Sequence, residues 1–491
     1  MLSDVRCVLI NPYLEPTDLR GELQSIDGDK THESALNYGL LVVASTLVNH
    51  GAQVEIVDLE RNEEDWKTQL DSAVARTDPQ WIGIGTLSVY SFLPTREILR
   101  HCRQCYPGVV TVVGGQNAQN VPRLLDRVGE RHLLDYALCG DGERAVRELA
   151  NAIMSNREPH FQGINAVPNG EINIQFADRV PLEGDSTFLH YDLYPDFRHL
   201  WPVVEESRGC PYRCDFCANV LQGGAGIKYK DPALLVRELR RVFDVYGDEG
   251  EMPVVLMTSI FGVNPQLTKE FFTMLAAESI RPQFVASTRV DLNFDAYIDL
   301  VPRYFDQMHF GLETGATQMV GLMQKAKRPE HYLRRAEQTL AAWHRRGVHT
   351  AVNFIAGYLG ETSETLEESI AFLECNRQNI DSAWGGALIA YPDSPFARRF
   401  QEVKDEFGAR LEVVSDYCDL LQTYPVSPSG SLSYSDVLGY VDKVHDIFYD
   451  SARYYHHYKW YVGPRRDQDI PAFVTRDEFE YRFHITRPEH A

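Results

Sequence analysis

The feature that most constrains the fold is an alternation of short apolar runs with longer segments whose apolar residues recur at helical spacing. In the first third of the sequence, the apolar runs are VRCVLIN, QVEIVDL, WIGIG, VVTVVGG and DYALC. Parallel strands need long crossover connections, which are usually helices. This alternation therefore predicts a doubly wound parallel sheet with helices on both faces, over residues 1–155.

The turns that follow these predicted strands are rich in glycine and small polar residues. Open parallel sheets bind ligands beyond the carboxyl ends of their strands, so we expect a binding site at these turns. No G-x-G-x-x-G loop is present, which argues against NAD or FAD. The candidate residues are Asn11, Tyr13, Thr86, Leu87, Ser88, Gly114, Gly115, Gln116, Asn117, Gly140, Asp141 and Gly142.

The alternation resumes at residue 201 and gives about six strand–helix units up to residue 398. Six units are fewer than the eight of a closed barrel, so we expect a partial (β/α)6 TIM-type barrel. Residues 156–200 are predicted to be a linker with a hairpin that turns at Asn169-Gly170. Residues 399–491 are predicted to form a helical, aromatic-rich tail that shapes the substrate site.

Length and charge restrict the functional class. The chain has 491 residues, too many for one hydrophobic core, and a formal net charge of -22. Because so acidic a surface repels phosphate groups, nucleic acid is an unexpected partner. We find no apolar run of membrane-spanning length and no secretory signal. Together with scattered cysteines, this predicts a cytoplasmic protein with no membrane partner.

Three of the nine cysteines, Cys210, Cys214 and Cys217, lie within eight residues. Thiolates suit iron–sulfur clusters and zinc. A cubane cluster takes one ligand per iron, so three thiolates would leave one iron open to a small chelating molecule. Zinc with a histidine as fourth ligand is the alternative, but no histidine follows within twenty residues. Unrelated buried thiols are a second alternative.

The segment SRGCPYRCDFC resembles the cluster loop of the radical S-adenosylmethionine (SAM) enzymes. The resemblance implies a [4Fe–4S] cluster on the three cysteines, with SAM bound to the open iron. An electron from an external flavodoxin- or ferredoxin-type reductant would then split SAM and release a 5′-deoxyadenosyl radical. In relatives the residue at Phe216 lies near the adenine.

Further motifs resemble the SAM-binding strands of this family in the expected order. The cysteine loop is followed along the chain by STRVD, GLETG, NFIAGYLGET and AYPDSPFA. One departure is that hydroxyl residues stand where relatives carry paired acids. The resemblance implies SAM contacts from Arg289, Glu313, Ile355, Gly357 and Tyr391, together with Thr258 and Ser259 at the departing position.

Residues 5–150 are similar to the cobalamin-binding domain that precedes many radical SAM barrels. The resemblance implies a corrin on the carboxyl edge of the sheet, held by the turn residues named above. The pattern D-x-H-x-x-G, which supplies an axial histidine in other cobalamin proteins, is absent. We expect His32 to be a loop residue and not a cobalt ligand. The alternative is a domain that has lost its corrin and only docks the barrel.

Two other clusters admit simpler explanations. His101, Cys102 and Cys105 share one predicted helix, where packing explains them better than an incomplete zinc site. The segment YYHHYKWY at 454–461 either lines a substrate pocket, with His456 or His457 as an acid or base, or packs the tail on the barrel.

The combined reading is a radical SAM enzyme with cobalamin. It predicts methyl transfer to an unactivated carbon or a phosphorus of a small molecule or peptide. Radical rearrangement, ring closure, epimerisation or dehydration without methylation is the first alternative. A non-catalytic sensing module is the second. A transfer-RNA thiolating enzyme is the third, and the acidic composition disfavours it.

Overall fold

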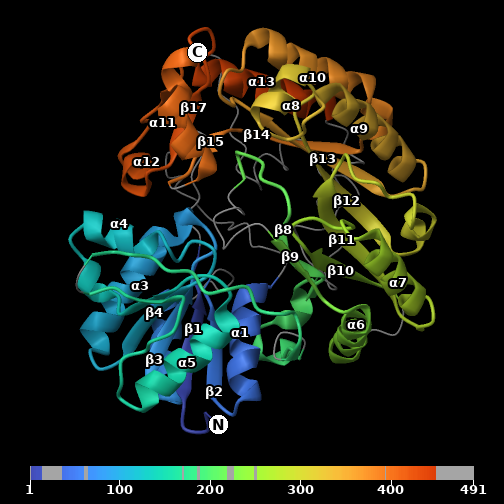
Figure 1. The fold of residues 1–491 in the computed structure, drawn as a ribbon. Coiled ribbons are helices and arrows are strands. Elements are labelled where there is room, and N and C mark those ends of the chain that lie inside the picture. Colours follow the sequence, from blue (N-terminus) through green and yellow to red (C-terminus); the bar gives the residue numbers. More distant parts are fainter. Residues whose placement is uncertain are drawn as a thin grey trace. The chain divides into compact units, whose positions relative to one another are not determined.

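The computed structural model describes residues 2–13, 36–59, 65–168, 171–184, 188–217, 226–247, 251–392 and 394–448. The described residues form two compact units, with the boundary between Leu200 and Trp201 (Figure 1). We call residues up to Leu200 unit 1 and residues from Trp201 onward unit 2. His32, the Asn169-Gly170 turn and the 454–461 segment lie outside the described residues.

Unit 1 is built on a six-stranded sheet in the order β2-β1-β3-β4-β5-β6, of which the first five strands are parallel. This confirms the doubly wound α/β prediction. The strands are β1 (Arg6–Asn11), β2 (Gln53–Asp58), β3 (Trp81–Gly85), β4 (Val110–Gly114), β5 (Tyr136–Leu138) and β6 (Ile164–Ala166).

Five helices connect the strands of unit 1. Helix α1 packs against α5, while α3 packs against α4. Side-chain caps explain where two of them begin. The Asn37 side chain accepts a hydrogen bond from the amide of Leu40, and the Asp65 side chain accepts one from the amide of Lys67. The helices are α1 (Tyr38–Asn49), α2 (Trp66–Thr77), α3 (Phe92–Cys105), α4 (Val121–Arg127) and α5 (Gly142–Met154).

The segment 156–200, which we expected to link the domains, contributes to unit 1. Its strand β6 pairs antiparallel with β5. The second arm of the expected hairpin is not a strand. It is attached instead through the Asn165 side chain, which accepts from the amide of Gln175 at 2.7 Å and donates to its carbonyl at 3.0 Å. An amide side chain can replace strand pairing because it carries both a donor and an acceptor.

Unit 2 is built on six parallel strands in the order β14-β13-β12-β11-β10-β7. In the described residues β7 and β14 are the open edges, as expected for a partial barrel. The strands are β7 (Val203–Glu205), β10 (Glu251–Met257), β11 (Arg281–Arg289), β12 (Phe305–Glu313), β13 (His349–Ala356) and β14 (Ser382–Ala387).

The barrel strands alternate with helices, and a buried aromatic cluster that includes Phe261, Phe272, Phe305 and Trp343 fills the layer between them. The helices are α6 (Pro232–Tyr246), α7 (Pro265–Leu275), α8 (Thr317–Leu322), α9 (Pro329–His344) and α10 (Ser363–Cys375). A separate two-stranded ribbon, β8 (Ser207–Cys210) with β9 (Gly226–Tyr229), carries the first cysteine of the predicted loop.

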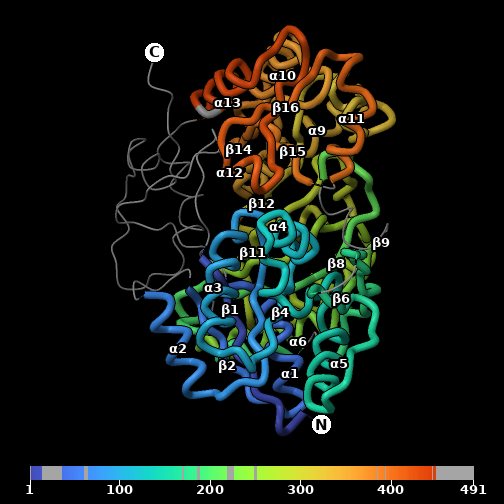
Figure 2. The backbone as a smooth tube through the Cα atoms, turned by 90° about the vertical axis from the view of Figure 1, so that its left-hand side faces the viewer, coloured from blue at the N-terminus to red at the C-terminus, as the bar shows by residue number. Residues whose placement is uncertain are grey.

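The tail is helical in part. Its helices are α11 (Pro395–Phe407), α12 (Asp416–Leu421) and α13 (Tyr434–Phe448), and α13 packs on β14 (Figure 2). The sequence reading missed a small antiparallel sheet of β15 (Ile389–Ala390), β17 (Tyr424–Ser427) and β16 (Arg410–Leu411). Strands of two to four residues are too short to leave a periodic pattern.

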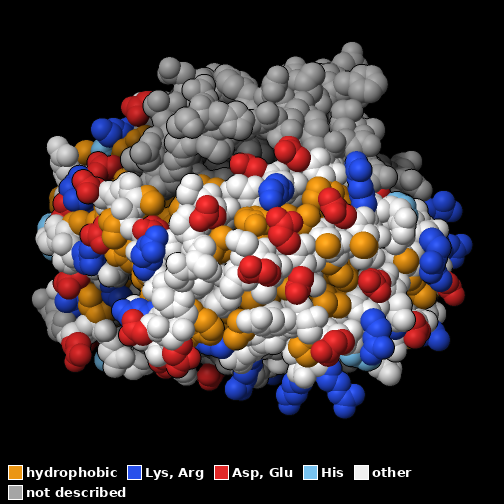
Figure 3. Space-filling view, turned by 90° about the horizontal axis from the view of Figure 1, so that it is seen from above, with side chains coloured by type: hydrophobic (Ala, Val, Ile, Leu, Met, Phe, Trp, Pro, Cys, Tyr) orange, Lys and Arg blue, Asp and Glu red, His pale blue; other side chains and the backbone are white. Residues whose placement is uncertain are grey.

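The surface agrees with a chain of mixed charge. Acidic and basic side chains are interspersed over the face shown in Figure 3. Within the described residues, no helix is both long and apolar enough to cross a membrane.

Candidate active site

The cysteine loop begins at the end of the β8 ribbon. Cys214 is buried, while Cys210 and Cys217 are half-buried. The amide of Cys217 donates to the carbonyl of Cys214 at 3.1 Å, and the amide of Asp215 donates to the carbonyl of Met323 at 3.3 Å. The loop is therefore folded on itself and tied to the segment after α8.

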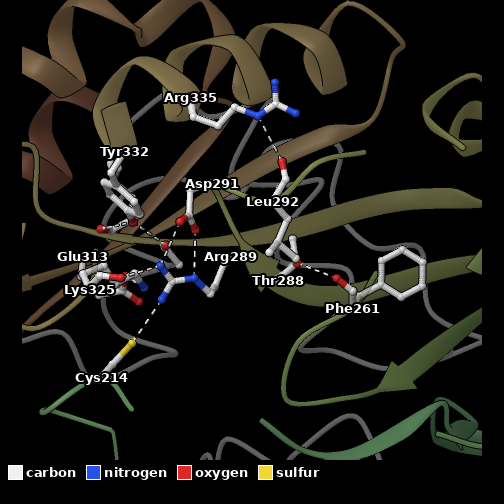
Figure 4. Close-up of polar contacts among 12 residues, drawn as sticks. Cys214, Phe261, Thr288, Arg289, Asp291, Leu292, Glu313, Lys325, Tyr332 and Arg335 are labelled. Atoms are coloured by element: carbon white, nitrogen blue, oxygen red, sulfur yellow. Dashed lines mark hydrogen bonds and ion pairs between the residues drawn. The ribbon is translucent and has the colours of Figure 1, made fainter. Parts of the chain in front are cut away.

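Arg289 lies at the carboxyl end of β11 and reaches the cysteine loop (Figure 4). Its Nη1 donates to the sulfur of Cys214 at 3.2 Å. Its Nε and Nη2 form a two-pronged pair with Asp291 at 2.9 and 3.0 Å. The structure thus brings together a predicted cluster ligand and a predicted SAM-binding arginine, and Asp291 is a partner that sequence reasoning missed.

Glu313 ends β12, where the pairing with β13 is irregular. Its φ of 60° is left-handed, a conformation that costs a non-glycine residue roughly 1–2 kcal/mol and marks functional sites. The Glu313 carboxylate pairs with the ammonium of buried Lys325 (Figure 4). Sequence reasoning missed Lys325. In the structure its ammonium lies 5.5 Å from the ring centroid of Phe216.

Thr258 and Ser259 follow β10, at the position where relatives carry acids. Thr258 shares a 2.7 Å hydrogen bond with the Ser207 hydroxyl, whereas Ser259 is exposed. A carboxyl group is nevertheless present, because Glu206 lies beside this pair. Burial raises the pKa of Glu206 to about 7, against hydrogen bonds from Ser207 and Thr258 that lower it. The sequence feature that could have revealed Glu206 is the pair of acids in WPVVEES.

The loop after β13 is ordered by a buried acid. Gly357 has a φ of 88°, and Glu361 accepts hydrogen bonds from the amides of Gly357 and Tyr358. Burial raises the pKa of Glu361 to about 8, although these amides lower it. Ile355 is half-buried on the strand before the loop, and Tyr391 is 39% exposed after β15.

A second tether on the cysteine loop comes from the tail. The carboxylate of Asp215 accepts from the Tyr358 hydroxyl at 2.6 Å and from Arg399 at 3.2 Å. Tyr358 and Arg399 both also donate to the carbonyl of Leu322. Sequence reasoning missed this network because its members are up to 184 positions apart.

In unit 1, several predicted cobalamin residues shape the turns at the carboxyl edge. Thr86 donates to the carbonyl of Gly114 at 2.8 Å, and Asn117 donates to that of Ser88 at 3.1 Å. Asn11 donates to Asp58 at 3.0 Å, and Asp141 accepts from the amide of Val180 at 2.7 Å. Tyr13 is half-buried, and Gly142 begins α5.

The remaining members of the predicted set leave an accessible surface on this edge. Leu87, Gly115, Gln116 and Gly140 are exposed. The resemblance assigns the glycines of this set to contacts with the corrin. The structure gives Gly115 and Gly140 another reason, since an added Cβ would lie 2.7 Å from Thr86 O and 2.6 Å from Ala177 O, respectively. Gly114 would meet nothing within 4 Å. An exposed leucine among neutral amides fits a corrin.

The surroundings of the three cysteines differ from those of a site for a single metal ion. Within the described residues, no three His, Cys, Asp or Glu side chains are close enough to hold a single metal ion. A cubane binds each thiolate at a different iron and does not need all three thiolates on one metal ion. Burial raises the pKa of Cys210, while the charges of Arg289 and Lys325 favour its thiolate form.

The cluster at His101 is consistent with helix packing. Cys102 is 1% exposed, and His101 bonds Asp71 on α2 at 2.6 Å, so it joins two helices. Cys105 is exposed, with its sulfur 3.8 Å from the His101 ring.

Comparisons with known proteins agree with both units. Residues 204–373 match the Radical SAM superfamily, and residues 26–150 match the B12 binding domain. An uncharacterised methyltransferase of Pyrococcus horikoshii is 24% identical, over 72% of this chain and 76% of its own. An anaerobic magnesium-protoporphyrin IX monomethyl ester cyclase of Rubrivivax gelatinosus is 23% identical, over 69% of this chain and 61% of its own.

Among solved structures, the radical SAM methyltransferase TsrM from Kitasatospora setae, with cobalamin and a [4Fe–4S] cluster bound, has the same fold. It superposes with a TM-score of 0.63 at 18% identity, over 84% of this chain and 78% of its own. Fold and site together define a radical SAM domain preceded by a B12-binding domain. The chain carries both of these domains, and the two domain families imply a [4Fe–4S] cluster, SAM and cobalamin as cofactors.

Proposed function

We propose that the protein is a cobalamin-dependent radical SAM methyltransferase that acts on an unactivated carbon of a small molecule or peptide. The observation that carries this proposal is the cysteine loop, fixed by Arg289 and Asp215, in the same chain as a B12-type sheet edge. When bound, the cluster supplies the electron that splits SAM, and cobalamin carries a methyl group.

The residues of unit 2 have distinct tasks in this proposal. Cys210, Cys214 and Cys217 bind the cluster. Phe216 and the loop held by Glu361 pack against the adenosine of SAM, and Tyr391 lies at the rim. Glu313 accepts hydrogen bonds from polar groups of SAM, and Thr258 and Ser259 lie near its amino group. These roles follow the resemblance and agree with the burial and contacts described above.

The residues of unit 1 provide a platform for the corrin. Exposed Leu87 would contact its apolar face, and Gln116 would bond its amides. Thr86, Ser88, Asn117 and Asn11 hold the turns in place through their bonds within the unit. A flavodoxin- or ferredoxin-type protein supplies the electron, and the enzyme works in the cytoplasm.

The test uses full-length protein reconstituted without oxygen with iron, sulfide and cobalamin, then given SAM bearing a deuterated methyl group and a reductant. We expect iron–sulfur and corrin absorption together, and 5′-deoxyadenosine among the products. A candidate substrate should gain one deuterated methyl group by mass spectrometry. Zinc or no metal at the cysteines would refute the proposal, as would turnover that persists without all three thiols.

A second candidate is ring closure without methylation, since one similar protein is an anaerobic cyclase. The same experiment separates the two functions. A product that forms with 5′-deoxyadenosine but carries no deuterium would favour the second.

A further inference from the structure

Two buried cations lie beside the cysteine loop, and their partners differ. Arg289 is 6% exposed and Lys325 is 5% exposed. Resemblance alone assigns Arg289 to the SAM carboxylate and gives Lys325 no role. Their contacts point to another division of tasks (Figure 4).

The donors of Arg289 are nearly all engaged by the protein. A guanidinium has five N–H groups. Nε donates to Asp291, Nη2 donates to Asp291 and to the carbonyl of Lys325 at 2.7 Å, and Nη1 donates to Cys214. Within the described contacts, one N–H on Nη1 is left for any ligand. A two-pronged bond to a second carboxylate would require Arg289 to release Asp291.

The guanidinium is also held on its faces. It lies 4.1 Å from the ring centroid of Tyr212 and 5.9 Å from that of Tyr332. Tyr332 is itself anchored, because its hydroxyl donates to the carbonyls of Gly311 and Leu312 on β12. Stacked and bonded in this way, Arg289 has no room to turn toward another partner.

Lys325 has the opposite character. Its ammonium carries three donors, of which one engages Glu313. The ammonium lies near the ring of Phe216, the residue between the second and third cysteines of the loop. The resemblance places SAM beside this ring. A lysine is a compact point charge that adapts to a ligand, whereas an arginine suits a fixed two-pronged site.

We propose that Arg289 is a positioning residue that fixes the Cys214 thiolate and raises the reduction potential of the cluster, while Lys325 binds the carboxylate of SAM. An N–H donor on a cysteine sulfur stabilises the additional negative charge of the reduced cluster. The inference rests on the radical SAM part of the proposed function and is independent of methyl transfer.

The test compares Arg289→Gln, Arg289→Lys, Lys325→Gln and Lys325→Arg in reconstituted full-length protein. Arg335→Gln is the matched control, since Arg335 bonds Leu292 and Asn293 and does not contact a cysteine. The first readout is the cluster's reduction potential without SAM, from a titration followed by electron paramagnetic resonance. The second is SAM affinity, from equilibrium dialysis of the cluster-loaded fraction.

We expect opposite patterns from the two positions. Arg289→Gln should shift the potential to more negative values and change SAM affinity by less than about threefold. Lys325→Gln should shift the potential less than Arg289→Gln does, because Lys325 acts on Cys210 only through its charge. It should weaken SAM binding about tenfold or more, the loss typical of a charge-assisted bond. Lys325→Arg should restore part of this affinity, because the charge returns. The control should match the wild type in both readouts.

The reverse pattern, in which Arg289→Gln weakens SAM binding and leaves the potential unchanged, would overturn the inference. If Arg289→Gln assembles no cluster, Arg289→Lys is the deciding variant, because it keeps the positive charge but loses the two-pronged guanidinium. A reduction potential that is unchanged in Arg289→Lys contradicts the inference. If the variants behave as expected and the wild-type protein nevertheless methylates no substrate, only the proposal of methyl transfer is refuted.

Discussion

The carboxyl edges of the two sheets are built from different chemistry. In unit 1, the neutral side chains of Thr86 and Asn117 bond the backbone of neighbouring turns, and the acids Asp58 and Asp141 accept from the Asn11 side chain and the Val180 amide. In unit 2, the corresponding edge carries buried ion pairs, including Arg289 with Asp291 and Lys325 with Glu313. An edge built from hydrogen bonds suits a large ligand that is held over a wide surface. A charged edge suits a compact, charged ligand and a cluster.

This difference predicts unequal responses to mutation. Removing one partner of a buried ion pair costs about 3–5 kcal/mol, because the other charge is left in a medium that cannot solvate it. A neutral side-chain hydrogen bond contributes only about 0.5–1.5 kcal/mol. Substitutions at the edge of unit 2 should therefore be the more damaging ones.

The largest effect is expected from the cysteines themselves. Replacing Cys210, Cys214 or Cys217 by alanine should abolish the cluster and with it the formation of 5′-deoxyadenosine. Iron content and the optical spectrum after reconstitution measure this loss. Cys375→Ala is the control, since Cys375 is an exposed thiol at the end of α10. A triple variant that retains four irons would remove the basis for the charged edge.

The next effect concerns the tether on the cysteine loop. Asp215→Ala leaves Arg399 without its carboxylate and removes the shorter hydrogen bond of Tyr358, so we expect a loss of about 3 kcal/mol in the free energy of unfolding. Chemical denaturation measures it. Asp295→Ala is the matched control, because Asp295 is 80% exposed and its pair with Arg335 spans 4.0 Å.

Surface ion pairs contribute about 0–1 kcal/mol, so Asp295→Ala should change the free energy of unfolding very little. Equal losses in the two variants would show that burial does not distinguish these pairs. The contrast between the two edges would then fail.

A smaller effect is expected at the carboxyl edge of unit 1. Leu87→Asp should weaken cobalamin binding about tenfold, as expected from the loss of one buried leucine contact, and should leave the cluster intact. Leu87 is 38% exposed, so the free energy of unfolding should change little. Met154→Asp is the control, because Met154 is similarly exposed at the end of α5. Corrin absorbance after gel filtration measures the binding, and equal retention by both variants would contradict the platform.

The sequence predicted the parts of the fold and site that are local. Strand–helix alternation gave both sheets, and the spacing of Cys210, Cys214 and Cys217 identified the cluster loop. The partners of these residues could not be predicted in the same way. Arg289 meets Cys214 across 75 positions and Arg399 meets Asp215 across 184, so neither pair leaves a local pattern. Glu206 was missed because only the fold brings it beside Thr258.

The change of stability with pH also separates the two units. Glu361 has a pKa near 4.5 when unfolded and about 8 in the folded protein, because burial disfavours its charge. The folded state therefore binds the proton more tightly, and stability contributed by this group falls as pH rises from about 4.5 to 8. In unit 1, bonds from Arg96 and Arg100 lower the pKa of Glu130 to about 2. Its contribution is complete above pH 4.5 and is lost only as pH falls toward 2.

Glu361→Gln should therefore flatten the decline in the free energy of unfolding between pH 5 and pH 8, leaving the part that Glu206 contributes. Glu130→Gln should lower stability by a constant amount over the same range, because its carboxylate is fully charged there. Urea denaturation at several pH values measures both. If Glu361→Gln keeps the wild-type slope, the acid that orders the loop after β13 is charged when folded, and the two units respond to pH alike.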